Sequence, residues 1–294
     1  MKHIAFIGAW IFVLFLTAAL SSCSGAAPDI LTTSTILADV TRNVVGDRFS
    51  VGALLPVGTD PHSYQPTPQD SAKISKTKVL VVNGAEYEHF LESMLGNAGG
   101  EKPLIEASAS LRLKTDAEHG TDPHLWLDPI NMVVYVENIR DGLEQFDPEG
   151  AEVYQSNARA YIAQLQELDA WINGQITQIP PPRRLLVTNH EAFGYFAEHY
   201  GFTVVGTVVE SFSSDASPSA QQMAALVDQI KLYEAPAIFL DASDNPSLAQ
   251  QIAAETGVKV ITDLHLESLT DGAPAGTYID MMKYNVTKII EALK

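Results

Sequence analysis

The chain has 294 residues, of which 46% are apolar, and its 36 acidic side chains against 18 basic ones give a formal charge of −18. The apolar fraction excludes a disordered chain, and the length suits two lobes better than one core. The negative charge excludes nucleic-acid binding, which depends on basic side chains that displace counterions from phosphates.

Residues 1–22 have the features of a bacterial export signal. Lys2 precedes an apolar run from Ile4 to Leu20, and small residues then lead to Cys23. A basic start, an apolar stretch and a small-residue boundary are typical of a signal that is cleaved after export. No later apolar run has the roughly 20 residues that a membrane-spanning helix needs.

The string Leu-Ser-Ser-Cys, which ends at Cys23, resembles the lipobox of bacterial lipoproteins. The resemblance implies cleavage before Cys23 and attachment of lipid to its thiol. Cys23 is the only cysteine of the sequence, so no disulfide can form within the chain, and the alternative is a free or buried thiol. We expect a protein outside the cytoplasm, anchored by lipid to a bacterial membrane at the cell surface or its periplasmic face.

Residues 23–28 are small and suit a flexible tether, and short apolar runs alternate with helical patterns over residues 29–146. Strands are expected at residues 30–34, 49–55, 79–83 and 103–107, and helices at 36–45, 68–77 and 88–95. A further helix begins at Pro129, after Asp128 as its capping residue. Alternating strands and helices predict a parallel sheet with right-handed crossovers, and hence an N-terminal α/β lobe.

One long helix is predicted over residues 147–179. Apolar residues recur there in steps of four and three, at Tyr154, Ala158, Tyr161, Leu165, Leu168 and Ile172. At 1.5 Å per residue such a helix would be about 45 Å long, more than the width of a lobe. Three consecutive prolines from Pro180 end it.

The alternation resumes over residues 180–294, which predicts a C-terminal α/β lobe. Strands are expected at residues 185–188, 203–209, 237–241 and 258–262, and helices at 191–200, 218–233, 246–256 and 278–293. The predicted fold class is α/β, with two lobes of mainly parallel sheets joined by one long helix.

Three of the eight histidines, His62, His124 and His190, lie in distinctive loops. The loops of His62 and His190 follow predicted strands directly, where open α/β sheets bind their ligands. Prolines precede His62 and His124 and restrict the backbone there. Taken one at a time, each histidine suits a surface or core position better than a metal site. The sequence contains neither a His-Glu-x-x-His motif nor a Cys/His cluster, so spacing alone identifies no metal site.

The loops as whole strings resemble a known family. They are Leu-Leu-Pro-Val-Gly-Thr-Asp-Pro-His ending at His62, Asp-Pro-His-Leu-Trp-Leu-Asp-Pro around His124, Asn-His-Glu-Ala-Phe-Gly-Tyr-Phe around His190, and the stretches from Ala253 to Val258 and from Tyr278 to Asn285. In this order they resemble the cluster A-I, or TroA-like and ZnuA-like, metal-binding lipoproteins that serve ABC importers. The resemblance covers nearly everything after Cys23 and implies two α/β lobes bridged by one helix.

The resemblance implies metal ligands at His62, His124, His190 and Glu267. Family members more often carry aspartate at the last position, and Asp263 and His265 are alternatives to Glu267. Two ligands from each lobe would place the ion in the interlobe cleft. The remaining histidines singled out, His89, His119 and His199, are expected on the surface, on helices or a loop.

Three neutral imidazoles and one carboxylate would leave a bound dication with one net positive charge, which is less costly to bury than two. Each imidazole must lose its proton to bind, so affinity is expected to fall below about pH 6.5. Imidazole-rich sites favour zinc over manganese, and family members with glutamate in place of His190 tend to carry manganese or iron. We therefore expect one divalent ion as transported ligand, Zn²⁺ first and Mn²⁺ next.

The expected function is that of an extracytoplasmic solute-binding lipoprotein, a monomer that delivers its ion to an ABC importer permease. No enzyme activity is expected, because a site filled by four ligands lacks the open position of catalytic zinc. A surface adhesin is the first alternative, since lipoproteins of this family have been described in that role. A zinc-dependent hydrolase is the second, and Glu191, beside His190, is its only candidate base.

Overall fold

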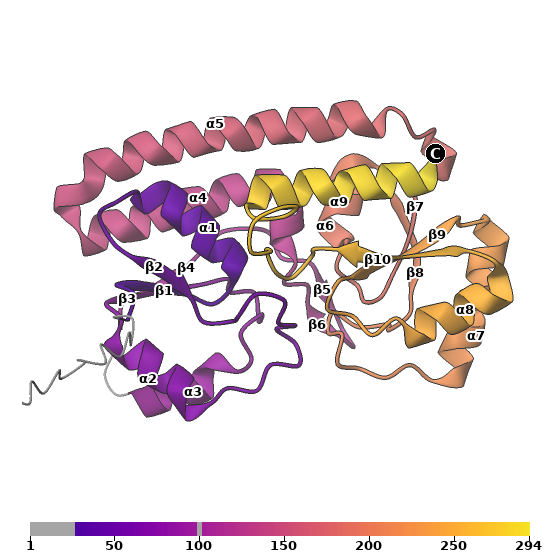
Figure 1. Cartoon of the computed structure of the whole chain (residues 1–294), viewed down its shortest axis with the longest axis horizontal. Coiled ribbons are helices and arrows are strands. Elements are labelled where there is room, and N and C mark those ends of the chain that lie inside the picture. The colour runs from indigo at the N-terminus through magenta and orange to yellow at the C-terminus, as the bar shows by residue number, and fades with distance from the viewer. Residues whose placement is uncertain (1–26, 99–101) are drawn as a thin grey trace, which may run out of the picture.

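The structure is a computed structural model that describes residues 27–98 and 102–294. The predicted signal peptide and Cys23 lie outside the described residues. Within the described part, the main strands form two four-stranded parallel sheets, in the orders β2-β1-β3-β4 and β10-β9-β7-β8. The predicted fold class, two α/β lobes with a long helix, is confirmed (Figure 1).

In the N-terminal lobe, the sheet contains β1 (Ile30–Thr32), β2 (Val51–Ala53), β3 (Val79–Val82) and β4 (Leu104–Glu106). Helices α1 (Thr35–Val45) and α4 (Pro129–Phe146) lie on one side of this sheet, and α2 (Pro68–Lys76) and α3 (Leu91–Ala98) on the other (Figure 1). Apolar clusters fill both faces, with Val40 in one and Ile74 in the other. The strands are therefore buried on both sides, which explains their nearly continuous apolar sequences.

The C-terminal lobe repeats this layout. Its sheet contains β7 (Leu185–Thr188), β8 (Thr203–Thr207), β9 (Ala237–Asp241) and β10 (Lys259–Leu264), and its helices are α6 (Gly194–Tyr200), α7 (Ala220–Tyr233), α8 (Ser247–Thr256) and α9 (Tyr278–Leu293). Helices α7 and α8 cover one face of the sheet, whereas α6 and α9 lie on the side of the long helix (Figure 1).

The long helix, α5 (Ala151–Ile176), runs across both lobes at the top of Figure 1. A short 3-10 turn (Pro148–Gly150) precedes it, and another (Pro181–Arg183) follows it. The apolar residues that predicted the helix are all buried. They join one core cluster that also includes Tyr135 of α4 and Tyr278 of α9. A shared core beneath α5 therefore joins the two lobes on the side of that helix.

Most element bounds differ by a few residues from the sequence-based expectations; the long helix, for example, spans Ala151–Ile176 and not residues 147–179. Helix α3 begins at Leu91 and not at residue 88, because the Glu88 carboxylate accepts hydrogen bonds from the backbone N–H groups of Asn83 and Gly84 and holds the preceding chain in a turn. Helix α6 begins at Gly194 and not at residue 191. A small antiparallel hairpin, β5 (Thr115–Asp116) with β6 (Gly120–Thr121), was not predicted because it is short and polar.

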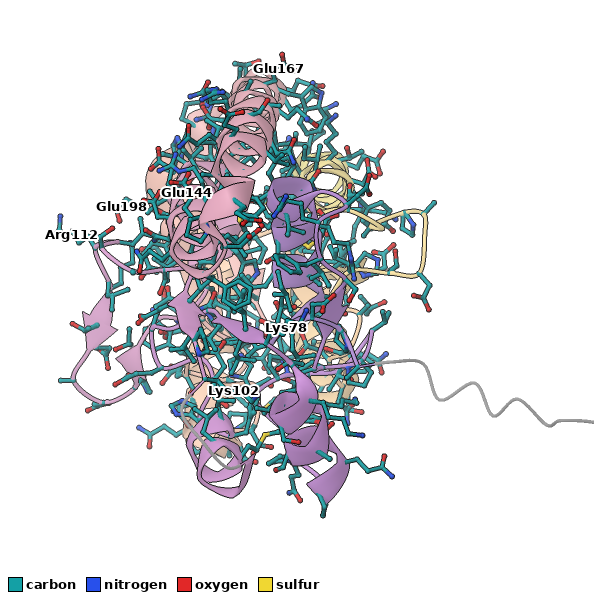
Figure 2. The ribbon with its side chains drawn as sticks, turned by 90° about the vertical axis from the view of Figure 1, so that its left-hand side faces the viewer. Lys78, Lys102, Arg112, Glu144, Glu167 and Glu198 are labelled. Atoms are coloured by element: carbon teal, nitrogen blue, oxygen red, sulfur yellow. The ribbon has the colours of Figure 1, made fainter. Side chains whose placement is uncertain are left out.

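Charged side chains project from the periphery. Figure 2 shows Glu167 at the top of the molecule, and Glu144, Glu198 and Arg112 lower down on the left. Lys78 lies on the N-terminal lobe and pairs with Asp29 at 2.8 Å. Among residues 27–98 and 102–294, no helix has both the length and the hydropathy of a membrane span.

Candidate metal centre

His62 lies in the long loop between β2 and α2. The side chain of Asp60 accepts a hydrogen bond from the His62 backbone N–H at 2.9 Å, which fixes the local turn. The His62 ring meets the Tyr87 ring edge-on, with centroids 6.3 Å apart. The His62 side chain is only 5% exposed, so the ring points into the protein although much of its loop is exposed.

His124 is fully buried and precedes a 3-10 turn (Leu125–Leu127) that leads into α4. Asp122 Oδ1 lies 2.9 Å from His124 Nδ1 and accepts the backbone N–H of His124 at 3.0 Å. A carboxylate on one ring nitrogen fixes the tautomer and aims the other nitrogen, here Nε2, at the site. Asp122 is therefore a candidate functional residue, one that the sequence did not single out. Its position two residues before His124 was the available signal.

His190 is the second residue after the end of β7, and Glu267 is the third residue after the end of β10. The Thr188 hydroxyl donates to the His190 carbonyl oxygen at 2.8 Å, which holds the turn after β7. Asp241, the last residue of β9, accepts the backbone N–H of Leu266 at 2.5 Å and that of Glu267 at 3.4 Å. Glu267 is thus oriented by a buried carboxylate from the neighbouring strand.

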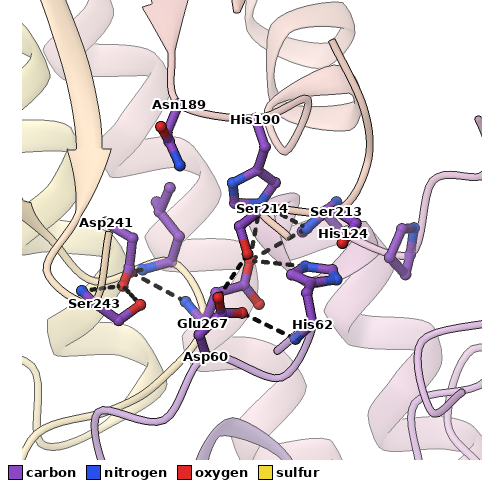
Figure 3. A network of polar contacts seen from close by, with 12 residues as sticks. Asp60, His62, His124, Asn189, His190, Ser213, Ser214, Asp241, Ser243 and Glu267 are labelled. Atoms are coloured by element: carbon purple, nitrogen blue, oxygen red, sulfur yellow. Dashed lines mark hydrogen bonds and ion pairs between the residues drawn. The ribbon is translucent and has the colours of Figure 1, made fainter. Parts of the chain in front are cut away.

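These four side chains converge although more than two hundred positions separate the first from the last. Each offers one possible ligand atom, and the four atoms lie within 4.8 Å of one another; the set is His62, His124, His190 and Glu267. Figure 3 shows them pointing toward one another from both lobes. Glu267 Oε1 lies 3.2 Å from His124 Nε2 and 3.3 Å from His190 Nε2.

The centre contains polar atoms that lack hydrogen-bond partners. Both carboxylate oxygens of Glu267 and the Nε2 of His62 are buried, and within the described residues none of them makes a hydrogen bond of good geometry. Leaving such groups unpaired is costly. A cation among them would satisfy all of these lone pairs at once, and imidazole nitrogen with carboxylate oxygen is a donor set that zinc accepts. The residues present therefore fit a divalent transition-metal ion.

The electrostatics of the centre favour a positive charge. Burial favours the neutral form of Glu267, but the imidazoles of His124, His190 and His62 outweigh it and hold its pKa well below the ordinary value. Burial also lowers the pKa of His124, yet Glu267 and Asp122 together raise it to about 9. With no metal ion between them, a proton on His124 would partly neutralise the carboxylate at neutral pH. This pKa lies above the value of about 6.5 assumed from the sequence.

The alternatives to Glu267 lie outside the four-residue group. Asp263 accepts hydrogen bonds from Tyr284 at 2.7 Å and from Lys288 at 2.6 Å, so its carboxylate is engaged elsewhere. The His265 ring lies beside the Tyr284 ring in a tilted arrangement, with centroids 5.5 Å apart. Burial lowers the pKa of His265. Among the described residues, the ligand group includes neither of them.

The remaining histidines have other partners or positions. His89 is exposed, and His119 lies at the tip of the β5–β6 hairpin, 3.1 Å from Asp116. His199 is more than a surface residue: its Nδ1 lies 2.8 Å from Asp128 Oδ1, and its Nε2 lies 3.4 Å from Asp169. It thereby connects α6 to the start of α4 and to α5.

Comparisons with known proteins agree over nearly the whole chain. A family profile described as "Zinc-uptake complex component A periplasmic" (ZnuA) matches residues 30–292. The manganese-binding lipoprotein MntA of Halalkalibacterium halodurans is 37% identical over 275 residues, which cover 93% of this chain and 91% of MntA. The iron ABC transporter substrate-binding lipoprotein MtsA of Streptococcus pyogenes serotype M1 is 28% identical over 302 residues, or 98% of this chain and 97% of MtsA.

A solved structure also has the same fold as this chain. That of the periplasmic zinc binding protein TroA from Treponema pallidum superposes with a TM-score of 0.84 at 28% sequence identity, and the match covers 90% of this chain and 99% of TroA. The architecture of two lobes and one long helix is therefore shared with this zinc binding protein.

Proposed function

The chain belongs to the ZnuA family of zinc-uptake components, and from this premise we propose that it captures one divalent transition-metal ion between its lobes and delivers it to the permease of an ABC importer. The family resemblance predicted from sequence is confirmed by the profile match over residues 30–292. The convergence of four potential ligand atoms within 4.8 Å is the observation that carries the proposal. The ligand set proposed is His62, His124, His190 and Glu267, and the ion is cargo, not a resident cofactor.

Zinc is the proposed first choice of cargo, with manganese next. Relatives of this chain are named for manganese, iron and zinc, so the family alone does not select the metal. Three imidazoles support zinc, because nitrogen ligands suit zinc and manganese prefers oxygen. The Irving–Williams order also ranks zinc above manganese at such a site.

Export and anchoring are proposed from the N-terminal sequence. The relatives MntA and MtsA are named as lipoproteins, which supports lipid attachment at Cys23 and a position outside the cytoplasm. The partners proposed are the importer permease and, through the lipid, the membrane. We expect the protein to act as a monomer.

The names of the relatives favour transport over the alternatives. They describe binding proteins of importers, and they support neither the adhesin nor the hydrolase hypothesis. Glu191, the candidate base of a hydrolase, lies outside the four-residue group, and its backbone N–H donates to the Ser211 carbonyl oxygen at 2.9 Å.

Native mass spectrometry with elemental analysis tests this function on the purified soluble form. The wild-type protein should bind one zinc ion, and Glu267→Ala should bind it weakly or not at all, because the only carboxylate of the ligand set is gone. Glu255→Ala is the matched control, since Glu255 is exposed on α8. A wild-type protein without a stoichiometric metal ion, or a Glu267→Ala variant that retains it fully, would contradict the proposal.

A further inference from the structure

The four proposed ligands are not held equally. Glu267 Oε1, His124 Nε2 and His190 Nε2 lie 3.2 to 3.3 Å from one another. His62 Nε2 lies 3.9 Å from the same carboxylate oxygen. Three ligands therefore form a close group, which we call the ligand triad, and His62 stands further out.

The segment that carries His124 is bonded to the C-terminal lobe, although it belongs to the N-terminal half of the sequence. Tyr195 OH donates to the Asp122 carbonyl oxygen at 3.1 Å. Trp126 Nε1 donates to the Leu266 carbonyl oxygen at 2.8 Å. His124 is thus flanked on both sides by hydrogen bonds to the lobe that carries His190 and Glu267.

Further contacts extend this attachment. Tyr278 OH donates to the Trp126 carbonyl oxygen at 2.7 Å, and His199 lies 2.8 Å from Asp128. Most of these groups are buried, where hydrogen bonds are costly to leave unmade. The ligand triad is therefore expected to move as one unit with the C-terminal lobe.

His62 is carried by a different kind of segment. Its loop, residues 56–67, is mostly exposed and lies between β2 and α2. At the start of the loop, Gly58 N–H donates to the Ser268 hydroxyl at 2.9 Å. Beside His62, Ser214 of the C-terminal lobe donates to Asp60 Oδ2 at 2.6 Å (Figure 3).

Asp60 joins two loops through its two carboxylate oxygens. Oδ1 accepts the backbone N–H of His62, and Oδ2 accepts the hydroxyl of Ser214. Ser214 lies in the segment after β8, which crosses the centre near His190 (Figure 3). A contact at this point couples the position of the His62 backbone directly to the opposite lobe.

We propose that His62 is the ligand that leaves first when the ion is released, and that the Ser214–Asp60 hydrogen bond is the latch that slows this step. The proposal rests on the proposed function. Movement of residues 56–67 would expose an ion that the ligand triad still holds, because hydrogen bonds from Trp126 and Tyr195 link the His124 segment to the lobe that carries His190 and Glu267. Ser214 and Asp60 are positioning residues and contact no ion in this scheme.

Release kinetics test the latch on the full mature chain in detergent. Zinc-loaded protein is mixed with an excess of a chromophoric chelator, and the absorbance of the zinc–chelator complex gives the release rate. Ser214→Ala should release zinc about three to ten times faster, while the association rate changes less than about twofold, because loss of one hydrogen bond to a carboxylate acts mainly on dissociation. Ser214→Thr, which keeps the hydroxyl, should restore slow release.

Ser213→Ala is the matched control. Ser213 is the neighbour of Ser214, and its hydroxyl accepts the backbone N–H of Asp215 within the same loop. This variant should release zinc at the wild-type rate. Equal release rates for Ser214→Ala and Ser213→Ala would overturn the latch.

A second pair of variants tests the order of the ligands. His62→Ala should still bind one zinc ion through the ligand triad, with faster release, whereas His190→Ala should lose far more affinity. Equal losses in the two variants would overturn the inference that His62 leaves first. If the wild-type protein itself binds no stoichiometric zinc, the proposed function fails, and this result is distinct from a failure of the latch.

Discussion

The indole of Trp126 donates a 2.8 Å hydrogen bond to the carbonyl oxygen of Leu266 in the opposite lobe. Leu266 immediately precedes Glu267, and the Trp126 ring also packs against the His124 ring, with centroids 5.2 Å apart. One buried side chain therefore contacts both a histidine of the centre and the strand end that presents its carboxylate. This contact sets the spacing of two proposed ligands that lie far apart in the sequence.

Trp126→Phe removes this donor and leaves the Leu266 carbonyl oxygen buried without it. We expect a loss of about 1–3 kcal/mol in the free energy of unfolding, measured by urea denaturation. The affinity for zinc should fall severalfold because Glu267 loses a fixed position relative to His124. Trp171→Phe, on α5, is the control and should leave zinc affinity unchanged. An unaltered affinity in Trp126→Phe would show that the indole does not position the carboxylate.

Removal of the ion should lower the thermal stability of the protein. A ligand that binds only the folded state at a hundred times its Kd adds about 2.7 kcal/mol to stability, which corresponds to a shift in Tm of about 5 °C for a chain of this size. Addition of a chelator should therefore lower the Tm of the zinc-loaded wild-type protein, as measured by scanning calorimetry. His190→Ala should show little of this shift, and a full shift in that variant would exclude His190 as a ligand.

Asp122→Asn tests the carboxylate that orients His124. An amide in place of the carboxylate weakens the bond to His124 Nδ1 and makes the ring a poorer ligand, so zinc affinity should fall about 10- to 100-fold. Competition with a chelator of known affinity measures this loss. Asp116→Asn, in the exposed hairpin, should have no such effect. If both variants bound zinc like the wild type, Asp122 would have no role at the centre.

Glu88 should make stability depend on pH. Its carboxylate accepts hydrogen bonds from Thr33, Asn83 and Gly84, but burial outweighs these donors and raises its pKa from 4.5 to about 7. Between these two values the folded state holds a proton that the unfolded state has released. The contribution of Glu88 to the free energy of unfolding is therefore fully present below about pH 4.5 and is lost as the pH rises through about 7.

The variant Glu88→Gln removes this ionisation while it keeps a polar group of the same size. Its free energy of unfolding, measured in urea at a series of pH values, should decline less between pH 4.5 and 7 than that of the wild type. Glu149→Gln, at an exposed position, should follow the wild-type profile. A Glu88→Gln profile parallel to the wild type would mean that Glu88 stays ionised in the folded protein.

Local sequence determined most of the secondary structure. The strands at Leu185–Thr188 and Ala237–Asp241 and the helix at Tyr278–Leu293 begin and end where the sequence predicts, because apolar runs and capping residues act over a few positions. The bounds differ from the prediction where a side chain bonds to the backbone, as before α3, where Glu88 accepts the backbone N–H of Asn83. The polar β5–β6 hairpin left no periodic signal.

The sequence by itself identified the family and proposed the four ligands, since long strings in order are specific even though no local metal motif exists. Only the tertiary structure decided which of the nearby acidic groups faces the centre. Along β10 and the residues after it, Asp263 is turned toward Lys288, whereas Glu267 is buried beside His124. The tertiary structure also links the His124 segment to the C-terminal lobe, through the hydrogen bond from Trp126 to Leu266. Contacts of this kind join residues more than a hundred positions apart, and no short-range pattern records them.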